Sequence, residues 1–304
     1  MNIVFMGTPE FAVPVLRTLH ESHHIIQAVV TVPDQWGGRN KNQRIESAVK
    51  KYAVANDLEL LQPTKLNKSS FLDRLRNLQP DLIVVVAFRK LPKLVWSIPR
   101  LGTINLHASL LPAYRGAAPI NHAIIQGEKV TGMTTFFIDD QIDTGHILLQ
   151  KEIPIDEDDT AGDLYEKMMA LSGNLVMRTI QGIEDQSIVP RPQNDDKASI
   201  APKVFFDQNE LDFDQPVKVV YNFIRGMSPY PASWTTYREK ILKIYFATPV
   251  KLPHNEVPGT IKTDYKSYFR IYCSDGYLYV KDLQWEGKRR MKIKDFLNGL
   301  NPDS

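Results

Sequence analysis

The segment Asn2-Ile3-Val4-Phe5-Met6-Gly7-Thr8-Pro9-Glu10 carries the signals of a short strand followed directly by a helix. Its first five residues form a short apolar run that is typical of a buried strand. Thr8 has the form of an N-cap, with Pro9 at the first helical position and Glu10 in the first turn. We therefore expect a strand at 2–6 and a helix that continues to about His20.

The same alternation continues along the first part of the chain. Ile25–Thr31 predicts a second strand, Ile45–Asn56 a helix, and Leu82–Ala87 a continuous apolar strand of the kind buried in parallel sheets. Strand, helix and strand in repetition predict an α/β fold with a Rossmann-like, doubly wound parallel sheet. Gly7 is not followed by the second and third glycines that let a backbone approach a pyrophosphate, which argues against a nicotinamide cofactor.

A further predicted strand, Leu101–His107, carries Asn105 and His107 two positions apart. Both side chains then point to one face, near the carboxyl end of the strand, where open α/β sheets bind their ligands. With Asp143 of a later Asp-Thr-Gly turn, they supply an amide, an imidazole and a carboxylate, which can polarise a carbonyl and move a proton. Each residue also has an ordinary interpretation: a turn cap for Asn105, a hydrogen-bonded buried ring for His107 and a turn residue for Asp143.

Composition limits the class of protein. With 304 residues, 43% of them hydrophobic, the chain is long enough for about two packed domains. The single cysteine, Cys273, excludes an internal disulfide and a multi-cysteine zinc site, and we expect no metal. The amino-terminal apolar run has no basic residues before it, and no uncharged span reaches about 18 residues. We expect a cytoplasmic protein without a signal peptide or a membrane segment.

The last part of the chain has a different pattern. A helix is expected over Ala161–Ile183, where apolar residues recur at helical spacing, and Val189–Lys197 has the composition of a linker. Beyond it, short β-rich runs separated by turn signals predict a small antiparallel barrel. These runs are Trp234–Tyr237, Leu242–Phe246, Tyr268–Cys273 and Gly276–Val280.

Charge is unevenly distributed along the chain. The formal net charge is only +2, but from Lys218 onward fifteen Lys or Arg residues stand against eight Asp or Glu residues. Such a surplus favours a polyanionic partner, because neutralising phosphates gives affinity that is independent of sequence. A well-solvated surface explains the same surplus equally well.

Longer sequence motifs indicate the function more specifically than composition does. One runs from Asn105-Leu106-His107-Ala108-Ser109-Leu110-Leu111-Pro112 to Tyr114-Arg115-Gly116-Ala117-Ala118-Pro119-Ile120. The others are Gly7-Thr8-Pro9-Glu10-Phe11-Ala12, Pro33-Asp34 with Gly38-Arg39, Gly127-Glu128 with Thr131-Gly132, Asp143-Thr144-Gly145, Ala201-Pro202-Lys203, Ile224-Arg225 with Pro229-Tyr230-Pro231, and Leu283–Met291. The first motif resembles the folate-dependent formyltransferases as a whole, and the carboxy-terminal segments resemble the methionyl-tRNA formyltransferases among them.

The resemblance implies an enzyme that transfers the formyl group from 10-formyltetrahydrofolate to the free amino group of methionyl initiator tRNA. It also implies that Asn105, His107 and Asp143 are the catalytic residues. An amine that attacks the formyl carbon produces an oxyanion, which needs hydrogen-bond donors, and a cationic nitrogen, which must lose a proton. Asn105 and His107 would serve these needs, with Asp143 holding the imidazole.

The resemblance places the folate contact on the loop that follows His107, with the pterin between this loop and Ala87–Leu91. An apolar slot with a few polar groups suits a flat heterocycle. The chain departs from the family pattern at Phe88-Arg89-Lys90-Leu91, where an aromatic-glycine pair and an extra residue are usual. The predicted folate-binding residues are Ser109, Leu110, Leu111 and Pro112.

The resemblance also makes the loop between Pro33 and Ser47 the element that distinguishes the initiator tRNA. Its predicted contacts are Arg39, Lys41 and Arg44. Further phosphate contacts, which position RNA without reading its sequence, are expected in the carboxy-terminal part of the chain. They are Lys203, Arg225 and the basic run Lys288–Arg290.

By the same resemblance, residues 1–189 form a catalytic formyltransferase domain, 190–206 a linker, and 207–304 a tRNA-binding β-barrel of the oligonucleotide-binding type. We expect a monomer. Two other functions stay open from the residues alone. The formyl acceptor could be an amino sugar nucleotide, a purine precursor amine or water. The chain could also be a nucleic-acid-binding module on an inactive scaffold, although the complete Asn105, His107 and Asp143 set argues against it.

Overall fold

The structure is a computed structural model that describes residues 1–37 and 43–300. The chain divides into two compact units. The first unit consists of Met1–Gly116, Thr131–Ile153 and Tyr165–Ile200, and the second of the rest of the chain. The units are therefore not continuous in sequence, and the predicted boundaries at 189 and 207 stay predictions. None of the helices in the described ranges combines the length and the apolar character that crossing a membrane requires.

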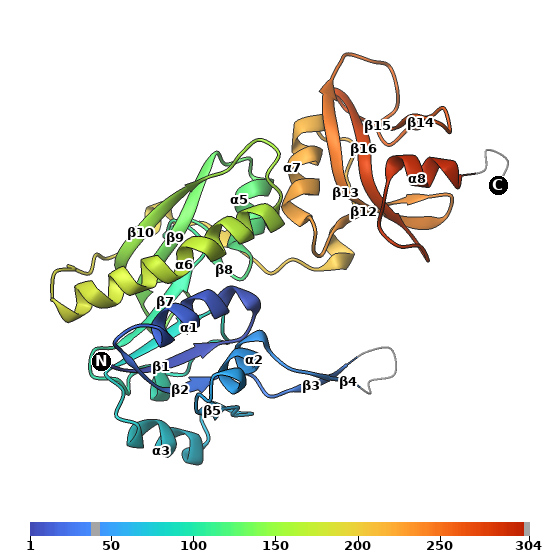
Figure 1. Ribbon diagram of the computed structural model, residues 1–304. Helices are drawn as coiled ribbons and strands as arrows, with labels where there is room; N and C mark the ends of the chain where they lie inside the picture. The colour runs from blue at the N-terminus through green and yellow to red at the C-terminus, as the bar shows by residue number, and fades with distance from the viewer. Residues whose placement is uncertain (38–42, 301–304) are drawn as a thin grey trace. The chain divides into compact units, whose positions relative to one another are not determined.

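The first unit is built on a seven-stranded sheet (Figure 1). Its strands are β1 (Asn2–Gly7), β2 (Ile25–Val30), β5 (Leu60–Leu61), β6 (Leu82–Val86), β7 (Thr103–His107), β9 (Val130–Phe137) and β10 (Ile147–Pro154). Their order across the sheet is β10-β9-β7-β6-β1-β2-β5. The strands from β5 to β7 are all parallel, which confirms the predicted Rossmann-like sheet. An extension that was not predicted follows, because β9 runs antiparallel to β7.

Helices lie on both faces of this sheet. On one face, Val4 and Met6 of β1 pack with Phe71 and Leu75 in a buried cluster. Alternate residues of β1 point to the opposite face, because side chains alternate along a strand. The elements between and beside the strands are α1 (Val13–His20), α2 (Ala48–Ala55), α3 (Ser69–Asn77), α4 (Lys93–Trp96), α6 (Ala161–Glu184), the short strands β3 (Gln35–Gly37), β4 (Gln43–Ile45), β8 (Arg115–Gly116) and β11 (Ile200–Ala201), and the 3₁₀ helices Glu10–Ala12 and Asp195–Lys197.

Two predicted helix starts in the first unit are wrong. The first helical turn is a 3₁₀ helix with Pro9 at the N-cap, and the Thr8 hydroxyl has no hydrogen-bond partner in the described residues. The helix expected from Ile45 begins at Ala48, because Gln43–Ile45 pairs with Gln35–Gly37 as the β3–β4 hairpin. Ser47 is its N-cap, and the Ser47 hydroxyl accepts a hydrogen bond of 3.0 Å from the backbone N–H of Lys50.

The second unit contains a curled antiparallel sheet, in agreement with the small β-barrel predicted for the end of the chain. Its strands are β12 (Ser233–Tyr237), β13 (Lys240–Lys251), β14 (Ile261–Thr263), β15 (Phe269–Cys273), β16 (Gly276–Trp285) and β17 (Met291–Lys292). They follow the order β12-β13-β16-β15-β14, with β17 paired to β16. Cys273 pairs with Gly276, so a two-residue turn joins β15 and β16.

The helices of the second unit were not predicted from the pattern. They are α5 (Pro119–Ile125), α7 (Val217–Met227) and α8 (Ile293–Asn298), with a 3₁₀ helix at Phe206–Gln208. Helix α7 buries Val220 and Ile224 against residues of β13 and β16 in one core cluster. Neither α7 nor α8 has a side-chain hydrogen bond at its N-cap, where Pro216 and Lys292 stand. The usual sequence signal for a helix start is therefore absent from both.

Candidate active site

Strand β7 places Asn105 and His107 near the carboxyl end of the parallel part of the sheet. Asn105 lies opposite Phe136 of β9, and His107 lies opposite Thr134. Because the two residues are two apart on a regular strand, their side chains share one face. The His107 residue is only 6% exposed, whereas Asn105 is partly exposed.

Asp143 lies beside the His107 ring. Its Oδ2 atom is 3.7 Å from His107 Nδ1, which is an ion pair when the imidazole is protonated. The other ring nitrogen, Nε2, donates a hydrogen bond of 2.9 Å to the backbone carbonyl of Tyr114. The imidazole is thus oriented from both sides, by a carboxylate and by a carbonyl.

The turn that holds Asp143 is fixed by several contacts. Asp143 has a φ of 58°, and its Oδ2 accepts a hydrogen bond of 2.9 Å from the backbone N–H of Gly116. The Gln193 amide donates to the carbonyls of Asp143 and Gly145, both at 2.9 Å. A Cβ on Gly145 would come within 1.6 Å of the Phe137 carbonyl oxygen, so only glycine fits there. The carboxylate is therefore preorganised next to His107.

The Asn105 side chain has no hydrogen-bond partner among residues 1–37 and 43–300. A side-chain amide carries two N–H donors. Both are available to a ligand at the end of β7. Asn105 thus supplies free donors beside a positioned imidazole, which is the arrangement that an oxyanion requires.

The loop after His107 is held rigidly by its own contacts. The buried Ser109 hydroxyl donates to the Ala113 carbonyl at 2.6 Å, so it is engaged within the loop. The Thr134 hydroxyl donates to the Ser109 carbonyl at 2.7 Å and accepts from the Leu111 N–H at 3.0 Å. The Gln150 amide donates to the Leu111 carbonyl at 2.9 Å. Leu111 is buried, which leaves Leu110 and Pro112 partly exposed.

The segment with the unusual sequence Phe88–Leu91 is tied to a neighbouring loop. Arg89 donates hydrogen bonds to the carbonyls of Thr64, at 3.0 Å, and Pro63. Burial lowers the pKa of the Arg89 guanidinium below its ordinary value. Leu91 belongs to the core of the first unit. Arg89 therefore ties this segment to the loop of Pro63 and Thr64.

The predicted RNA loop is described only in part. Arg39 and Lys41 lie outside the described residues. Arg44 is in β4, with a side chain that is 62% exposed, and its Nε donates to Asp34 Oδ2 at 2.5 Å. Lys50 Nζ donates to the same oxygen at 2.5 Å, and this hydrogen bond is the main reason that the pKa of Asp34 is lowered to about 2. Asp34 thus anchors the base of the β3–β4 hairpin.

Two predicted phosphate contacts in the second unit have opposite environments. Lys203 is exposed, with its Nζ 5.0 Å from the centre of the Phe205 ring. Arg225 is 2% exposed, and it donates hydrogen bonds of 3.0 Å to the Asn222 side chain and to the Asp159 carbonyl. Burial lowers the pKa of Arg225 below its ordinary value. The prediction of a phosphate contact is wrong for Arg225, because its guanidinium is enclosed in the core.

The basic run Lys288–Arg290 lies at the surface of the second unit. Arg290 is partly engaged, because its guanidinium bonds both carboxylate oxygens of Asp282, at 3.0 and 2.7 Å. On the same sheet, Arg270 lies over the rings of three tyrosines, which are Tyr268, Tyr277 and Tyr279. A cavity of about 480 Å³ is lined by the same Tyr268, by Tyr237 and Tyr265, and by Arg238 and Lys262. The unit therefore presents cationic and aromatic groups together.

Sequence reasoning missed three residues that position the site. Thr134 and Gln150 hold the Ser109–Pro112 loop, and Gln193 holds the Asp143 turn. Gln193 lies in the stretch predicted to be a linker, 50 residues from its partner. Nothing in the local pattern distinguishes these amides and hydroxyls from ordinary surface residues, so only the folded chain reveals them.

Comparisons with known proteins cover both parts of the chain. Residues 1–180 match the family model described as formyl transferase, and residues 203–301 match that of the formyl transferase C-terminal domain. A methionyl-tRNA formyltransferase of Parabacteroides distasonis is 48% identical over 310 residues, which cover 99% of this chain and 96% of the relative. One of Bacteroides thetaiotaomicron is 44% identical, with 99% and 96% covered.

A solved structure is similar in fold. It is that of WlaRD, a sugar 3N-formyl transferase determined in the presence of dTDP and 5-N-formyl-THF. The TM-score is 0.69 at 21% sequence identity, with 95% of this chain and 99% of the other chain covered. At this level of identity, the likeness extends to the fold alone.

Proposed function

Because this chain belongs to the family of methionyl-tRNA formyltransferases, we propose that it transfers the formyl group of 10-formyltetrahydrofolate to the free amino group of methionyl initiator tRNA. The product is N-formylmethionyl-tRNA for translation initiation. The observation that carries the proposal is the 3.7 Å contact between His107 Nδ1 and Asp143 Oδ2. His107 lies on β7, the strand that also presents the free Asn105 amide. It supplies formyl-transfer chemistry in a chain that resembles these enzymes over nearly its whole length.

In the proposed reaction, the amino nitrogen attacks the formyl carbon and forms a C–N bond. The bond between that carbon and N10 of the folate then breaks, and the proton lost by the amine ends on N10. Negative charge develops on the formyl oxygen in between. Asn105 donates a hydrogen bond to this oxygen, and because the donor is already in place, no reorganisation is needed as the charge appears.

His107 is the proposed acceptor of the proton that the attacking amine loses. Its ring is oriented by the Tyr114 carbonyl at Nε2 and by Asp143 at Nδ1. Asp143 would stabilise positive charge on the imidazole as the reaction proceeds. The Gly116 and Gln193 hydrogen bonds to the Asp143 turn keep that carboxylate in position.

The folate donor is proposed to bind against the loop of Ser109, Leu110, Leu111 and Pro112. Leu110 and Pro112 are partly exposed and apolar, which suits the face of a flat heterocycle. The hydrogen bonds from Thr134 and Gln150 fix the backbone of this loop. The Ser109 hydroxyl is engaged by Ala113, so we assign it a role in shaping the loop.

The initiator tRNA is proposed to contact the loop of Arg39, Lys41 and Arg44 and the basic surface of the second unit, including Lys203. Such phosphate contacts give affinity that falls steeply with salt. Raising the salt concentration is therefore expected to raise the KM for tRNA while leaving the KM for folate nearly unchanged. Equal sensitivity of both constants would contradict the electrostatic part of the proposal.

The direct test is formyl transfer from 10-formyltetrahydrofolate to methionine-charged initiator tRNA. Charged elongator tRNA and a reaction without RNA serve as controls, and a dTDP-linked amino sugar tests the other acceptor class. Formylation of the initiator tRNA alone supports the proposal. Transfer to the sugar, turnover of folate without RNA, or RNA binding without turnover would each reject it.

We further propose that the protein acts as a monomer in the cytoplasm. Size-exclusion chromatography with light scattering tests the first point, since a mass near 34.7 kDa is expected. A mass of twice this value would refute it.

A further inference from the structure

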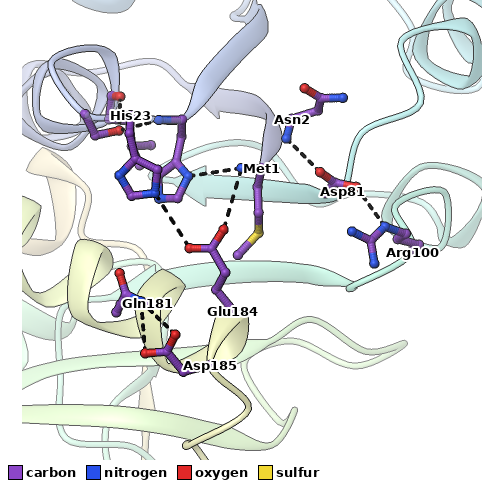
Figure 2. A network of polar contacts seen from close by, with 11 residues as sticks. Met1, Asn2, His23, Asp81, Arg100, Gln181, Glu184 and Asp185 are labelled. Carbon is purple, nitrogen blue, oxygen red and sulfur yellow. Dashed lines mark hydrogen bonds and ion pairs between the residues drawn. The ribbon is translucent and has the colours of Figure 1, made fainter.

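A second cluster of ligating side chains lies in the first unit. His23 and His24 stand in the turn before β2, and Glu184 is the last residue of α6. One ligand atom from each of the three residues lies within 4.8 Å of the others. Figure 2 shows His23 and Glu184 pointing toward one another from segments that are far apart in sequence. No step of the proposed reaction uses these residues.

The cluster combines one fixed ring with two groups that can adjust. His24 is 6% exposed, whereas the His23 side chain is 66% exposed and Glu184 lies at the surface. His23 Nε2 is 3.7 Å from Glu184 Oε2, and the two imidazole ring centres are 4.0 Å apart. The two more exposed side chains can turn toward a small ion while the buried His24 ring stays in place.

This corner of the structure already attracts positive charge. The Met1 amino nitrogen lies 3.8 Å from Glu184 Oε1 and 3.2 Å from His24 Nδ1 (Figure 2). The carboxylate and the ring nitrogen thus face a common space that the Met1 amino group occupies, and a bound ion has to displace this group. A divalent ion there would be drawn by the same carboxylate and would gain nitrogen ligands as well.

The donor set selects the class of ion. Two imidazole nitrogens and one carboxylate oxygen form the three-ligand set of open zinc sites, with water in the fourth position. At the usual bond lengths, the donor atoms of a tetrahedral zinc site lie about 3.4 Å apart. Ligand atoms that are 4.8 Å apart therefore need to approach one another by about 1.4 Å. Ca²⁺ and Mg²⁺ prefer oxygen ligands, of which this cluster offers only one residue.

We propose that His23, His24 and Glu184 form a binding site for a divalent transition metal ion of the Zn²⁺ type. The site lies at the amino end of β2, whereas Asn105 and His107 lie at the carboxyl end of β7. Because these strands run parallel, the amino end of β2 and the carboxyl end of β7 lie at opposite ends of the strands of the sheet. The ion therefore joins the start of β2 to the end of α6, and it acts on the stability of the first unit rather than on formyl transfer.

The test uses full-length, tag-free protein freed of metal with a chelator and titrated with Zn²⁺ by calorimetry. We expect one ion per chain, and a loss of affinity of at least tenfold in each of His23→Gln and Glu184→Gln. Asp185→Asn is the matched control, because Asp185 is an exposed carboxylate adjacent to Glu184 that bonds Gln181 instead. Its affinity should equal that of the unsubstituted protein. Variants of His24 are avoided because its ring is buried.

A second readout separates this site from adventitious binding at other surface histidines. Zn²⁺ should raise the Tm of the unsubstituted protein and of Asp185→Asn, since an ion that binds only the folded state stabilises it. It should leave the Tm of Glu184→Gln unchanged. The proposal is overturned if Zn²⁺ does not bind, if the affinity is the same in His23→Gln and Glu184→Gln, or if Mg²⁺ binds equally well.

Discussion

Nε2 of His107 donates a hydrogen bond of 2.9 Å to the backbone carbonyl oxygen of Tyr114. A carbonyl oxygen only accepts, so this ring nitrogen carries a hydrogen in the structure. Tyr114 has a φ of 61°, in the left-handed region that residues other than glycine rarely adopt. The loop after β7 therefore keeps an uncommon backbone conformation at the residue that orients His107.

The His107→Ala substitution should lower kcat by about 10²- to 10⁴-fold, the usual contribution of a positioned acid or base. The KM for folate should change little, because the proposed folate contacts come from the following loop. Steady-state kinetics with both substrates measures this split. The control is His146→Ala, an exposed histidine in the same unit, which should retain full activity. Near-normal turnover in His107→Ala would remove His107 from the mechanism.

The Asn105→Ala substitution should lower kcat by about 10²- to 10³-fold, as expected for the loss of one oxyanion donor. Its Tm should stay close to that of the unsubstituted protein, because the Asn105 amide has no hydrogen-bond partner in the described part of the chain. Kinetics and thermal unfolding on the same sample check both statements. A large fall in Tm would show instead that Asn105 has a structural role.

The Asp143→Asn substitution separates charge from position. An asparagine oxygen can still accept the hydrogen bond from Gly116, and asparagine tolerates the positive φ of this residue. The charge beside His107 is lost, so kcat should fall by on the order of 10²-fold with little change in Tm. In Asp143→Ala the bond to Gly116 is lost as well, and the unfolding free energy should fall by about 1.5–3 kcal/mol. Equal kcat in Asp143→Asn and the unsubstituted protein would argue that the carboxylate only shapes the turn.

The single cysteine should be inert in the folded protein. Cys273 is fully buried in the core of the second unit, and burial raises the pKa of its thiol to about 12. Only the thiolate reacts readily, so iodoacetamide at pH 8 should not label the native protein but should label it in urea. Because the folded pKa exceeds the unfolded one, any stability from the neutral thiol is present below about pH 8.5 and is lost as the pH rises toward 12. Mass spectrometry after labelling decides the point, and rapid native labelling would contradict the burial.

The parallel sheet was predictable because its signals are local. Continuous apolar runs such as Leu82–Val86 and a spacing of two between Asn105 and His107 report strand geometry directly. Helix α7 escaped prediction because its N-cap residue, Pro216, offers no capping side chain, and its stability comes from packing Val220 and Ile224 on the sheet. Such packing depends on contacts between distant parts of the chain, which no local pattern reveals.

The candidate site also contains residues that the sequence could predict and residues that it could not. The motif residues Asn105 and His107 could be chosen from spacing and resemblance, and the structure brings Asp143 next to His107. Gln193 could not be chosen, because it holds the Asp143 turn from 50 residues away. Arg225 was predicted at the RNA surface from its charge, but the folded chain encloses it. A count of charges carries no information on burial.

The contrast between Lys203 and Arg225 gives a matched pair of substitutions in the second unit. Lys203→Ala should raise the KM for tRNA without changing the Tm, because its side chain is exposed and contributes charge at the surface. Arg225→Met should leave the KM for tRNA unchanged and should destabilise the protein. The loss of its buried hydrogen bonds to the Asn222 side chain and the Asp159 carbonyl costs about 1–3 kcal/mol.

Thermal unfolding and steady-state kinetics with tRNA as the varied substrate measure both effects. A loss of this size should lower the Tm of Arg225→Met by several degrees. The salt dependence adds an independent check, because removing a phosphate contact flattens the dependence of tRNA affinity on salt, whereas removing a core arginine does not. If Arg225→Met raises the KM for tRNA at an unchanged Tm, the buried arginine must leave the core when RNA binds, and its assignment to the core would be wrong for the complex.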